Sequence, residues 1–235
     1  MDDSGIRVGV IGAAGRMGST VCDAVEAQAD LALVARVEHG DDLAKLIDAG
    51  VDVAVDFTVP DAVKDNVRFC LDNGIHVVIG TTGLSDEDLG EIGSWTGTAN
   101  AFYAPNFALG AVLMMKFAAL AARYYDHAEI IERHHERKLD APSGTAKRTA
   151  ALMGDADPAG DGSGGTAHGN VTIHSVRLPG LVAHQEVIFG APGETLTIKH
   201  DSIDRVSFMP GVILAIEKVA EHPGLTVGLE NLLDL

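Results

Sequence analysis

Three glycines near the start of the chain, Gly12, Gly15 and Gly18, constrain its fold more than any other feature. They follow the apolar run 6–11, and Gly18 lies within the helix-like segment 16–25, so the pattern predicts a strand, a tight turn and a helix. Glycines at this spacing let the backbone approach a pyrophosphate closely, and the helix start offers N–H groups to phosphate oxygens. The sequence therefore predicts the opening of a dinucleotide-binding βαβ unit.

Strand-like and helix-like segments alternate as far as residue 106. Further strands are expected at 31–37, 51–57, 75–79 and 101–104, and helices at 42–48, 60–73 and 85–95. Such alternation is typical of a parallel sheet covered by helices on both faces, so we expect an α/β, Rossmann-type, doubly wound domain. Glu38 follows the second strand, 20 residues after Gly18, where an acid can bind the adenosine ribose hydroxyls.

The pattern changes after residue 106. We expect helices over 107–125, 146–153 and 206–221, and strands over 128–133, 171–177, 183–189 and 195–200. Consecutive strands with short links favour a mixed or antiparallel sheet, so residues 107–205 are predicted to form a smaller α+β domain. The Gly-rich segment 154–169 is expected to be a mobile loop.

Composition narrows the class of protein. None of the 235 residues lies in a stretch of the roughly 18 uncharged apolar residues that a membrane helix needs. The net charge of −17 argues against nucleic acid or anionic lipid as a partner, because phosphates would be repelled. The acidic start at residues 1–4 is unlike a secretory signal, so a cytoplasmic location is expected. Asp exceeds Glu by 22 to 12, which favours a halophilic protein over an ordinary acidic one.

The segment 132–146 carries the densest group of reactive side chains. His134, His135 and Lys138 follow a strand, and Ser143-Gly144-Thr145 opens a helix. A helix start presents N–H groups to a carboxylate, a lysine adds positive charge, and a histidine can transfer a proton near neutral pH. The pattern predicts a site for an anionic substrate that needs a proton. A metal site is not favoured, because adjacent histidines in an extended chain face opposite ways and no cysteine or HExxH pattern accompanies them.

Over nearly its whole length the chain resembles the dihydrodipicolinate reductase family, also called 4-hydroxy-tetrahydrodipicolinate reductases. The motifs that carry this resemblance are VGVIGAAGRMG at 8–18, VDFT at 55–58, GTTG at 80–83, PNF at 105–107 and ExHHxxKxDAPSGTA at 132–146. The resemblance implies NAD(P)H-dependent reduction of (hydroxy)dihydrodipicolinate to tetrahydrodipicolinate in the diaminopimelate route of lysine biosynthesis. It also implies a cytoplasmic homotetramer built through the sheet of the second domain. Residues 1–106 and 206–235 then form the dinucleotide-binding domain, and 107–205 the substrate-binding and oligomerisation domain.

The resemblance also assigns roles to individual residues. His134 and Lys138 match the family's catalytic pair, and His135, Gly144 and Thr145 match its substrate-binding positions. The residues that match positions binding NADH or NADPH are Gly12, Ala13, Ala14, Gly15, Arg16, Met17, Glu38, Gly80, Thr81, Thr82, Ala104, Pro105, Asn106 and Phe107. His39 stands where many members place a basic residue that can meet a 2′-phosphate, so the choice between the two cofactors is left open.

Two alternatives stay open at this point. One is a related two-domain NAD(P)-dependent dehydrogenase of the aspartate or homoserine type, against which the segment 132–146 argues. The other is a non-catalytic dinucleotide-sensing protein, against which the presence of both His134 and Lys138 argues. A cyclic dicarboxylate is therefore the expected small-molecule partner.

Overall fold

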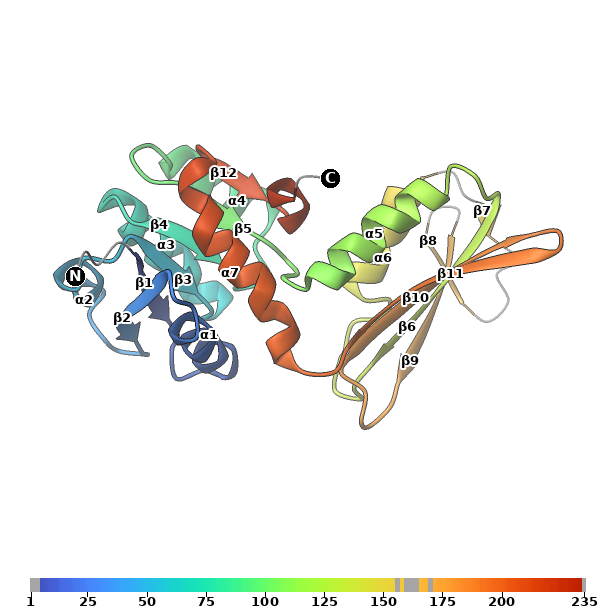
Figure 1. The fold of residues 1–235 in the computed structure, drawn as a ribbon, viewed down its shortest axis with the longest axis horizontal. Coiled ribbons are helices and arrows are strands. Elements are labelled where there is room, and N and C mark those ends of the chain that lie inside the picture. Colours follow the sequence, from blue (N-terminus) through green and yellow to red (C-terminus); the bar gives the residue numbers. More distant parts are fainter. Residues whose placement is uncertain (1–4, 155–156, 159–164, 169–170, 234–235) are drawn as a thin grey trace. The chain divides into compact units, whose positions relative to one another are not determined.

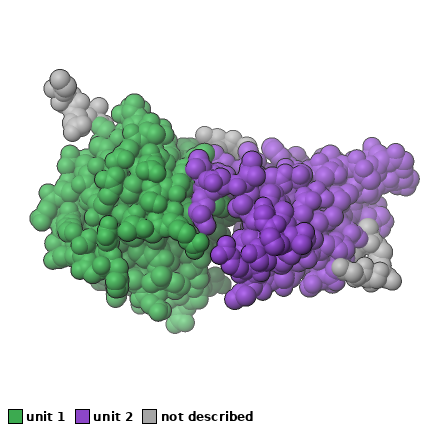
Figure 2. Space-filling model, turned by 90° about the horizontal axis from the view of Figure 1, so that it is seen from below, with its two compact units in different colours: residues 1–107, 208–235 green, residues 108–207 purple. Residues whose placement is uncertain are grey.

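The computed structural model describes residues 5–154, 157–158, 165–168 and 171–233. The chain divides into two compact units, of which unit 1 comprises residues 1–107 and 208–235 and unit 2 comprises residues 108–207 (Figure 2). Each unit contains its own sheet among the described residues. Unit 2 is thus an insertion in the sequence of unit 1.

Unit 1 has the predicted doubly wound parallel sheet (Figure 1). The strand order is β12-β5-β4-β3-β1-β2, and every pairing is parallel. The strands are β1 (Ile6–Ile11), β2 (Leu31–Val37), β3 (Val53–Asp56), β4 (His76–Ile79), β5 (Ala101–Tyr103) and β12 (Leu225–Val227). The helices are α1 (Arg16–Glu26), α2 (Ala44–Asp48), α3 (Pro60–Asp72), α4 (Asp86–Trp95) and α7 (Met209–Lys218).

Apolar side chains on both sides of the strands hold this sheet. Ala54 and Val77 are buried in one cluster with Val67 of α3 and Ile92 of α4, and α1 packs against α7. Burial on both faces explains why β3 and β5 are buried at every residue, without alternation. The carboxyl ends of the parallel strands then meet along one edge, where the loops that follow them gather.

Unit 2 contains the predicted mixed sheet. The order is β11-β10-β6-β9-β8, with β7 beside β6; β6 pairs parallel with β9 and antiparallel with β10. The strands are β6 (His127–His134), β7 (Asp157–Pro158), β8 (Thr166–His168), β9 (Val171–Arg177), β10 (Ala183–Ala191) and β11 (Glu194–Ser202). Helices α5 (Leu109–Ala121) and α6 (Gly144–Met153) cover the sheet and bury Ile130, Ile173, Val187 and Phe189.

Two helix predictions need correction. The helix expected over 107–125 ends at Ala121, because its apolar face stops at the exposed residues Arg123 and Tyr124. The helix expected over 206–221 is three pieces: the 3-10 helix η1 (Arg205–Phe208), α7, and the 3-10 helix η2 (Val219–Glu221). Pro210 lies in the first turn of α7, where a residue without an N–H group is tolerated, and this fixes where the α-helix begins.

Three strands were not predicted. β12 is too short to stand out in the sequence and pairs with β5 only after unit 2 has been inserted. The loop expected over 154–169 lies mostly outside the described residues, but its described parts contain β7 and β8, and β8 pairs antiparallel with β9. No helix in the described ranges has the length and apolar character needed to cross a membrane.

Candidate active site

The glycine turn after β1 is packed so closely that Gly12 and Gly18 have no room for a side chain. Gly12 has a φ of +83°, and a Cβ there would lie 2.5 Å from the carbonyl oxygen of Phe57. A Cβ on Gly18 would lie 2.0 Å from the carbonyl oxygen of Gly12, so this glycine lets α1 start directly against the turn. The N-cap of α1 is Gly15, which has no side chain to cap the helix. The N–H groups in the first turn of α1 therefore face the glycine turn, where a ligand can approach the backbone closely.

A pocket of about 1020 Å³ lies at the carboxyl ends of the unit 1 strands. Every residue predicted to bind the cofactor lines it except Ala13, whose side chain is buried in the core. The volume is at the top of the usual range for small-molecule sites and suits a ligand of dinucleotide size. His39, Phe57 and Thr58, which lie next to predicted cofactor positions or in a quoted motif, also line the pocket, and lining residues that were not predicted from the sequence include Asn66 and Phe208.

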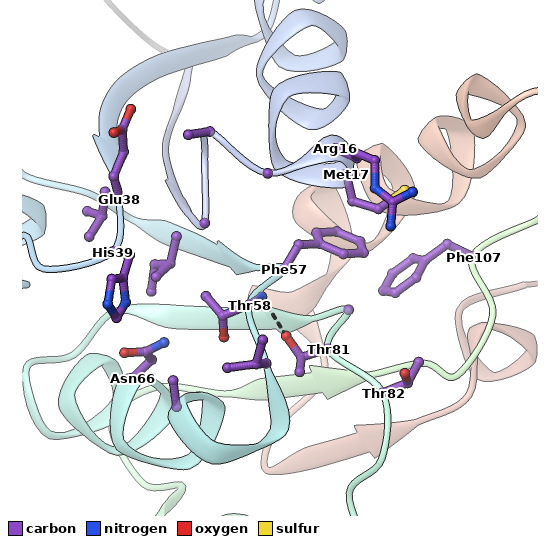
Figure 3. Close-up of a pocket in the computed structure, with 18 of the residues that line it drawn as sticks. Arg16, Met17, Glu38, His39, Phe57, Thr58, Asn66, Thr81, Thr82 and Phe107 are labelled. Atoms are coloured by element: carbon purple, nitrogen blue, oxygen red, sulfur yellow. Dashed lines mark hydrogen bonds between the residues drawn. The ribbon is translucent and has the colours of Figure 1, made fainter.

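The two ends of this pocket differ in chemistry (Figure 3). Glu38 and His39, both exposed, lie at one end, just after β2. Arg16 and Phe107 lie at the other end, where the rings of Phe57 and Phe107 have centroids 5.9 Å apart. The first end suits the hydroxyls of a ribose, and the second suits a flat ring.

A buried carboxylate orders the polar side chains of the pocket. Asp56, at the end of β3, is fully buried and accepts hydrogen bonds from the hydroxyls of Thr58 (2.7 Å) and Thr81 (2.6 Å) and the amide of Asn66 (2.8 Å). Burial raises the pKa of Asp56, although these hydrogen bonds oppose the shift. The Thr81 hydroxyl also accepts from the Thr58 N–H at 2.7 Å, as the dashed line in Figure 3 marks. Three lining residues are thus fixed by one carboxylate behind them.

The end of β6 and the loop that follows it carry the predicted proton-transfer residues of unit 2. The Nδ1 atom of His134 lies 2.5 Å from a carboxylate oxygen of Glu132. The Nζ atom of Lys138 lies 2.8 Å from a carboxylate oxygen of Asp140, and this contact lowers the pKa of Asp140. The Nδ1 atom of His135 is buried and has no hydrogen-bond partner among the described residues. Acidic and basic groups therefore surround the end of this strand.

The N-terminus of α6 is the second part of this site. The Ser143 hydroxyl caps the helix by accepting from the Ala146 N–H at 3.2 Å. Gly144 is exposed, and a Cβ there would meet no atom within 4 Å, so the space before the helix is open. The Thr145 carbonyl accepts from the Thr149 hydroxyl at 2.8 Å, which holds the first turn in place. An open helix start of this kind attracts a carboxylate.

Glu132 and Arg177 belong to this region but were not predicted as site residues. Glu132 is fully buried and forms a two-pronged ion pair with the Arg177 guanidinium, at 2.8 and 2.9 Å. Burial by itself would raise the pKa of Glu132, but the contacts with His134 and Arg177 lower it to about 2. The sequence held a signal for Glu132, because residues two apart on a strand share a face. It held none for Arg177, whose approach depends on the pairing of β6 with β9.

Comparison with known proteins agrees with this arrangement. The family model described as "Dihydrodipicolinate reductase, N-terminus" matches residues 6–107, and the one described as "Dihydrodipicolinate reductase, C-terminus" matches residues 110–233. The 4-hydroxy-tetrahydrodipicolinate reductase of Mycolicibacterium vanbaalenii is 53% identical over 244 aligned positions, which cover 98% of this chain and 100% of the relative. The enzyme of the same name from Corynebacterium efficiens is 50% identical and covers 98% of this chain and 99% of its own.

Solved structures give the same result. A dipicolinate-bound dihydrodipicolinate reductase from Paenisporosarcina sp. TG-14 is 39% identical with a TM-score of 0.86, covering 97% of this chain and 100% of that one. A probable dehydrogenase from Thermotoga maritima, 14% identical with a TM-score of 0.64, shares the fold. The predicted fold class and the predicted NAD(P)H-dependent reductase of the diaminopimelate route are confirmed. The chain belongs to the dihydrodipicolinate reductase family.

Proposed function

We propose that the protein binds NADH or NADPH in unit 1, binds a cyclic, unsaturated dicarboxylate in unit 2, and protonates that substrate as it is reduced. The grouping of His134, Lys138 and the open N-terminus of α6 carries this proposal. It combines a binding place for a carboxylate with groups that transfer a proton. The dipicolinate bound to the similar Paenisporosarcina reductase supports a dicarboxylate ligand here.

In unit 1, different residues that line the pocket bind different parts of the cofactor. The first turn of α1 binds the pyrophosphate, and Glu38 binds the adenosine ribose hydroxyls. The close packing at Gly12 and Gly18 supports this assignment, because Cβ atoms there would strike the backbone of Phe57 and Gly12 and displace the turn that approaches the phosphates. When bound, NAD(P)H supplies the hydride for the reduction. The proposed cofactor-binding residues are Gly12–Met17, Glu38, Gly80, Thr81, Thr82 and Ala104–Phe107.

In unit 2, Lys138 donates the proton from its ammonium group after leaving Asp140, and His134 supports the transfer through its Nε2 atom. The backbone N–H groups and the hydroxyl at Gly144 and Thr145 bind one substrate carboxylate. His135 helps to hold the substrate, and its buried Nδ1 atom, which has no partner in the described part of the chain, supports that role. Each of these side chains therefore binds the substrate, orients it or moves a proton.

Oxidation of NAD(P)H in the presence of the condensation product of pyruvate and aspartate semialdehyde tests this function. We expect turnover with that product, and no reduction of NAD(P)+ when aspartate or homoserine is supplied instead. Reduction of NAD(P)+ by either amino acid would indicate a dehydrogenase of the same two-domain plan. NADH binding without turnover of any of the three would indicate a sensor.

The Thr145→Val variant tests the carboxylate assignment. We expect the KM for the substrate to rise more than kcat falls, because the hydroxyl binds a group that is present in both ground and transition states. Inhibition by pyridine-2,6-dicarboxylate should weaken in parallel, and steady-state kinetics measure both effects. Thr195→Val, at an exposed position of β11, is the matched control. Unchanged inhibition by the dicarboxylate would show that Thr145 does not bind the substrate carboxylate.

Glu38 bears on the choice between NADH and NADPH. A 2′-phosphate at this end of the pocket would be repelled by the negative charge of Glu38. Arg36 is ion-paired with Glu26 at 2.7 Å and Arg16 lies at the opposite end of the pocket (Figure 3). Among the pocket-lining residues that the structure describes, His39 is thus the cationic candidate beside Glu38.

We therefore expect NADH to be preferred at about pH 8, with NADPH still usable. His39→Gln should lower kcat/KM for NADPH and leave NADH kinetics nearly unchanged, because it removes the basic side chain that would lie beside a 2′-phosphate. A strong NADPH preference at pH 8 in this variant would show that another cation reads the phosphate.

We also propose that the protein is halophilic, on the strength of its net charge of −17. Repulsion among surface carboxylates acts over about 30 Å at 0.01 M ionic strength and about 3 Å at 1 M. The melting temperature should therefore rise as KCl is increased from about 0.05 to 3 M. A melting temperature independent of KCl would contradict the proposal and indicate an ordinary acidic protein.

The family resemblance supports two further proposals about the whole protein. We place it in the cytoplasm, where its biosynthetic route operates. We also propose a homotetramer that forms through the sheet of unit 2. Sedimentation of the purified protein at several concentrations tests the second proposal, and a monomer at all of them would contradict it.

A further inference from the structure

We propose that Glu132 and Arg177 are a positioning pair that sets the geometry of both His134 and the loop carrying Lys138. This inference rests on the proposed roles of His134 and Lys138. Neither Glu132 nor Arg177 is assigned a contact with the substrate. Their role is to fix the side chains and backbone that make such contacts.

The carboxylate of Glu132 connects three parts of the site. Its Oε2 atom lies 2.5 Å from Nδ1 of His134, and its Oε1 atom accepts from the Ser143 N–H at 3.2 Å. Since an ionised carboxylate can only accept, Nδ1 of His134 carries the hydrogen in this contact. The other ring nitrogen, Nε2, is then the atom that can exchange a proton with a ligand. The same carboxylate thus sets the tautomer of His134 and holds the N-cap of α6.

The guanidinium of Arg177 extends this network to the loop. Besides its two contacts with Glu132, it donates to the carbonyls of Lys138 (3.3 Å) and Asp140 (2.7 Å). A further N–H donates to the carbonyl of Val176 at 2.8 Å. A planar group with five donors in fixed directions can bind a carboxylate and a loop at once, which an ammonium cannot. Arg177 therefore fixes the backbone from which the Lys138 side chain extends.

Stability alone is a weak explanation for this pair. A buried ion pair often adds little stability compared with apolar side chains of similar size. Most of the remaining contacts of Glu132 and Arg177 go to the proposed site, namely to His134, Ser143, Lys138 and Asp140. Another ion pair, Arg133 with Glu186 at 3.2 Å, joins β6 to β10 on the opposite face, because successive side chains of a strand alternate. It provides a matched control.

The experiment compares Glu132→Gln with Glu186→Gln in the full-length protein. Glu132→Gln should lower kcat by roughly 10- to 100-fold, a part of the 10²–10⁴ that a positioned proton-transfer group contributes. NADH binding, measured by titration, should change by less than about 2-fold. Glu186→Gln should keep wild-type kcat. Equal kinetics for the two variants would overturn the proposal.

A spectroscopic measurement separates positioning from a structural role. In the wild-type protein, ¹⁵N NMR of the His134 ring should show a hydrogen on Nδ1. Glu132→Gln should reduce the share of rings with a hydrogen on Nδ1. An Nδ1 atom without a hydrogen in the wild-type protein would overturn the proposal without any variant.

Arg177→Lys keeps the positive charge but loses the planar guanidinium fork with its five donors. This variant tests the proposal even if Glu132→Gln does not fold. Its kcat should fall several-fold and lie above that of Arg177→Ala, whereas wild-type kcat in Arg177→Lys would overturn the role of the fork. Failure of the underlying function looks different. In that case the wild-type protein would not turn over, or Lys138→Ala would keep full activity. Impaired Lys138→Ala with fully active Glu132→Gln would overturn the positioning pair alone.

Discussion

Replacing Lys138 with alanine should lower kcat by roughly 10²–10⁴-fold, the contribution of a positioned general acid. The variant loses the ammonium group that donates the proton in the proposed mechanism. Asp140 also loses the cation 2.8 Å away that lowers its pKa, so that pKa should return toward its ordinary value. Steady-state kinetics with the condensation product measure the loss. NADH affinity should hardly change, because the cofactor-binding residues lie in the unit 1 pocket.

Arg137→Ala is the matched control for this prediction. It removes one positive charge from the same loop, and the Arg137 side chain is 82% exposed, so its loss should leave kcat within about 2-fold. A fluorescence titration with NADH completes the test. Loss of NADH binding in Lys138→Ala equal to the loss of turnover would place this lysine in the cofactor site instead.

Gly18→Ala should weaken NADH binding by at least about 10-fold and lower the melting temperature. The new Cβ would lie 2.0 Å from the carbonyl oxygen of Gly12, and this contact is with backbone that cannot rotate away. Overpacking of this kind costs roughly 1–3 kcal/mol, or about 2–12 °C in a chain of this size. The helix start and the glycine turn must separate, which displaces the N–H groups proposed to bind the pyrophosphate.

Gly90→Ala provides the comparison. Gly90 lies inside α4, and a Cβ there would meet no atom within 4 Å. Alanine at this position should raise stability by about 0.5–1 kcal/mol, because glycine is entropically unfavourable within a helix. Calorimetry and NADH titration of both variants give the answer. Wild-type NADH affinity in Gly18→Ala would show that the turn does not hold the cofactor.

The fold of unit 1 could be predicted because its first five strands are mostly apolar segments that alternate with helix and turn patterns. The bounds of β2 were predicted to the residue, since polar residues flank it on both sides. β12 escaped prediction because a strand of three residues has no pattern of its own and forms by pairing with β5. The order of the unit 2 sheet was equally invisible, since β9 and β10 are consecutive in sequence but lie on opposite sides of β6.

The candidate site divides in the same way. Residues on one short segment, such as His134 and Lys138, could be grouped from the sequence, and their roles stay predictions. Asp56 stood in a quoted motif, yet its hydrogen bonds reach residues 10 and 25 positions further along the chain. Arg177 lies 45 residues from Glu132. Such partners are chosen by strand pairing, which local patterns do not specify.

The insertion of unit 2 into unit 1 has a consequence for the order in which the chain can fold during synthesis. When residue 107 leaves the ribosome, β5 has no neighbour on its outer edge, because β12 is made more than a hundred residues later. The partners of Asn100 are also not yet synthesised at that stage, because its side-chain amide donates to the carbonyls of Val219 and Ala220 at 3.1 Å. An open strand edge of this kind invites pairing with another chain. A truncated protein ending near residue 107 should therefore aggregate, although it contains the entire glycine turn.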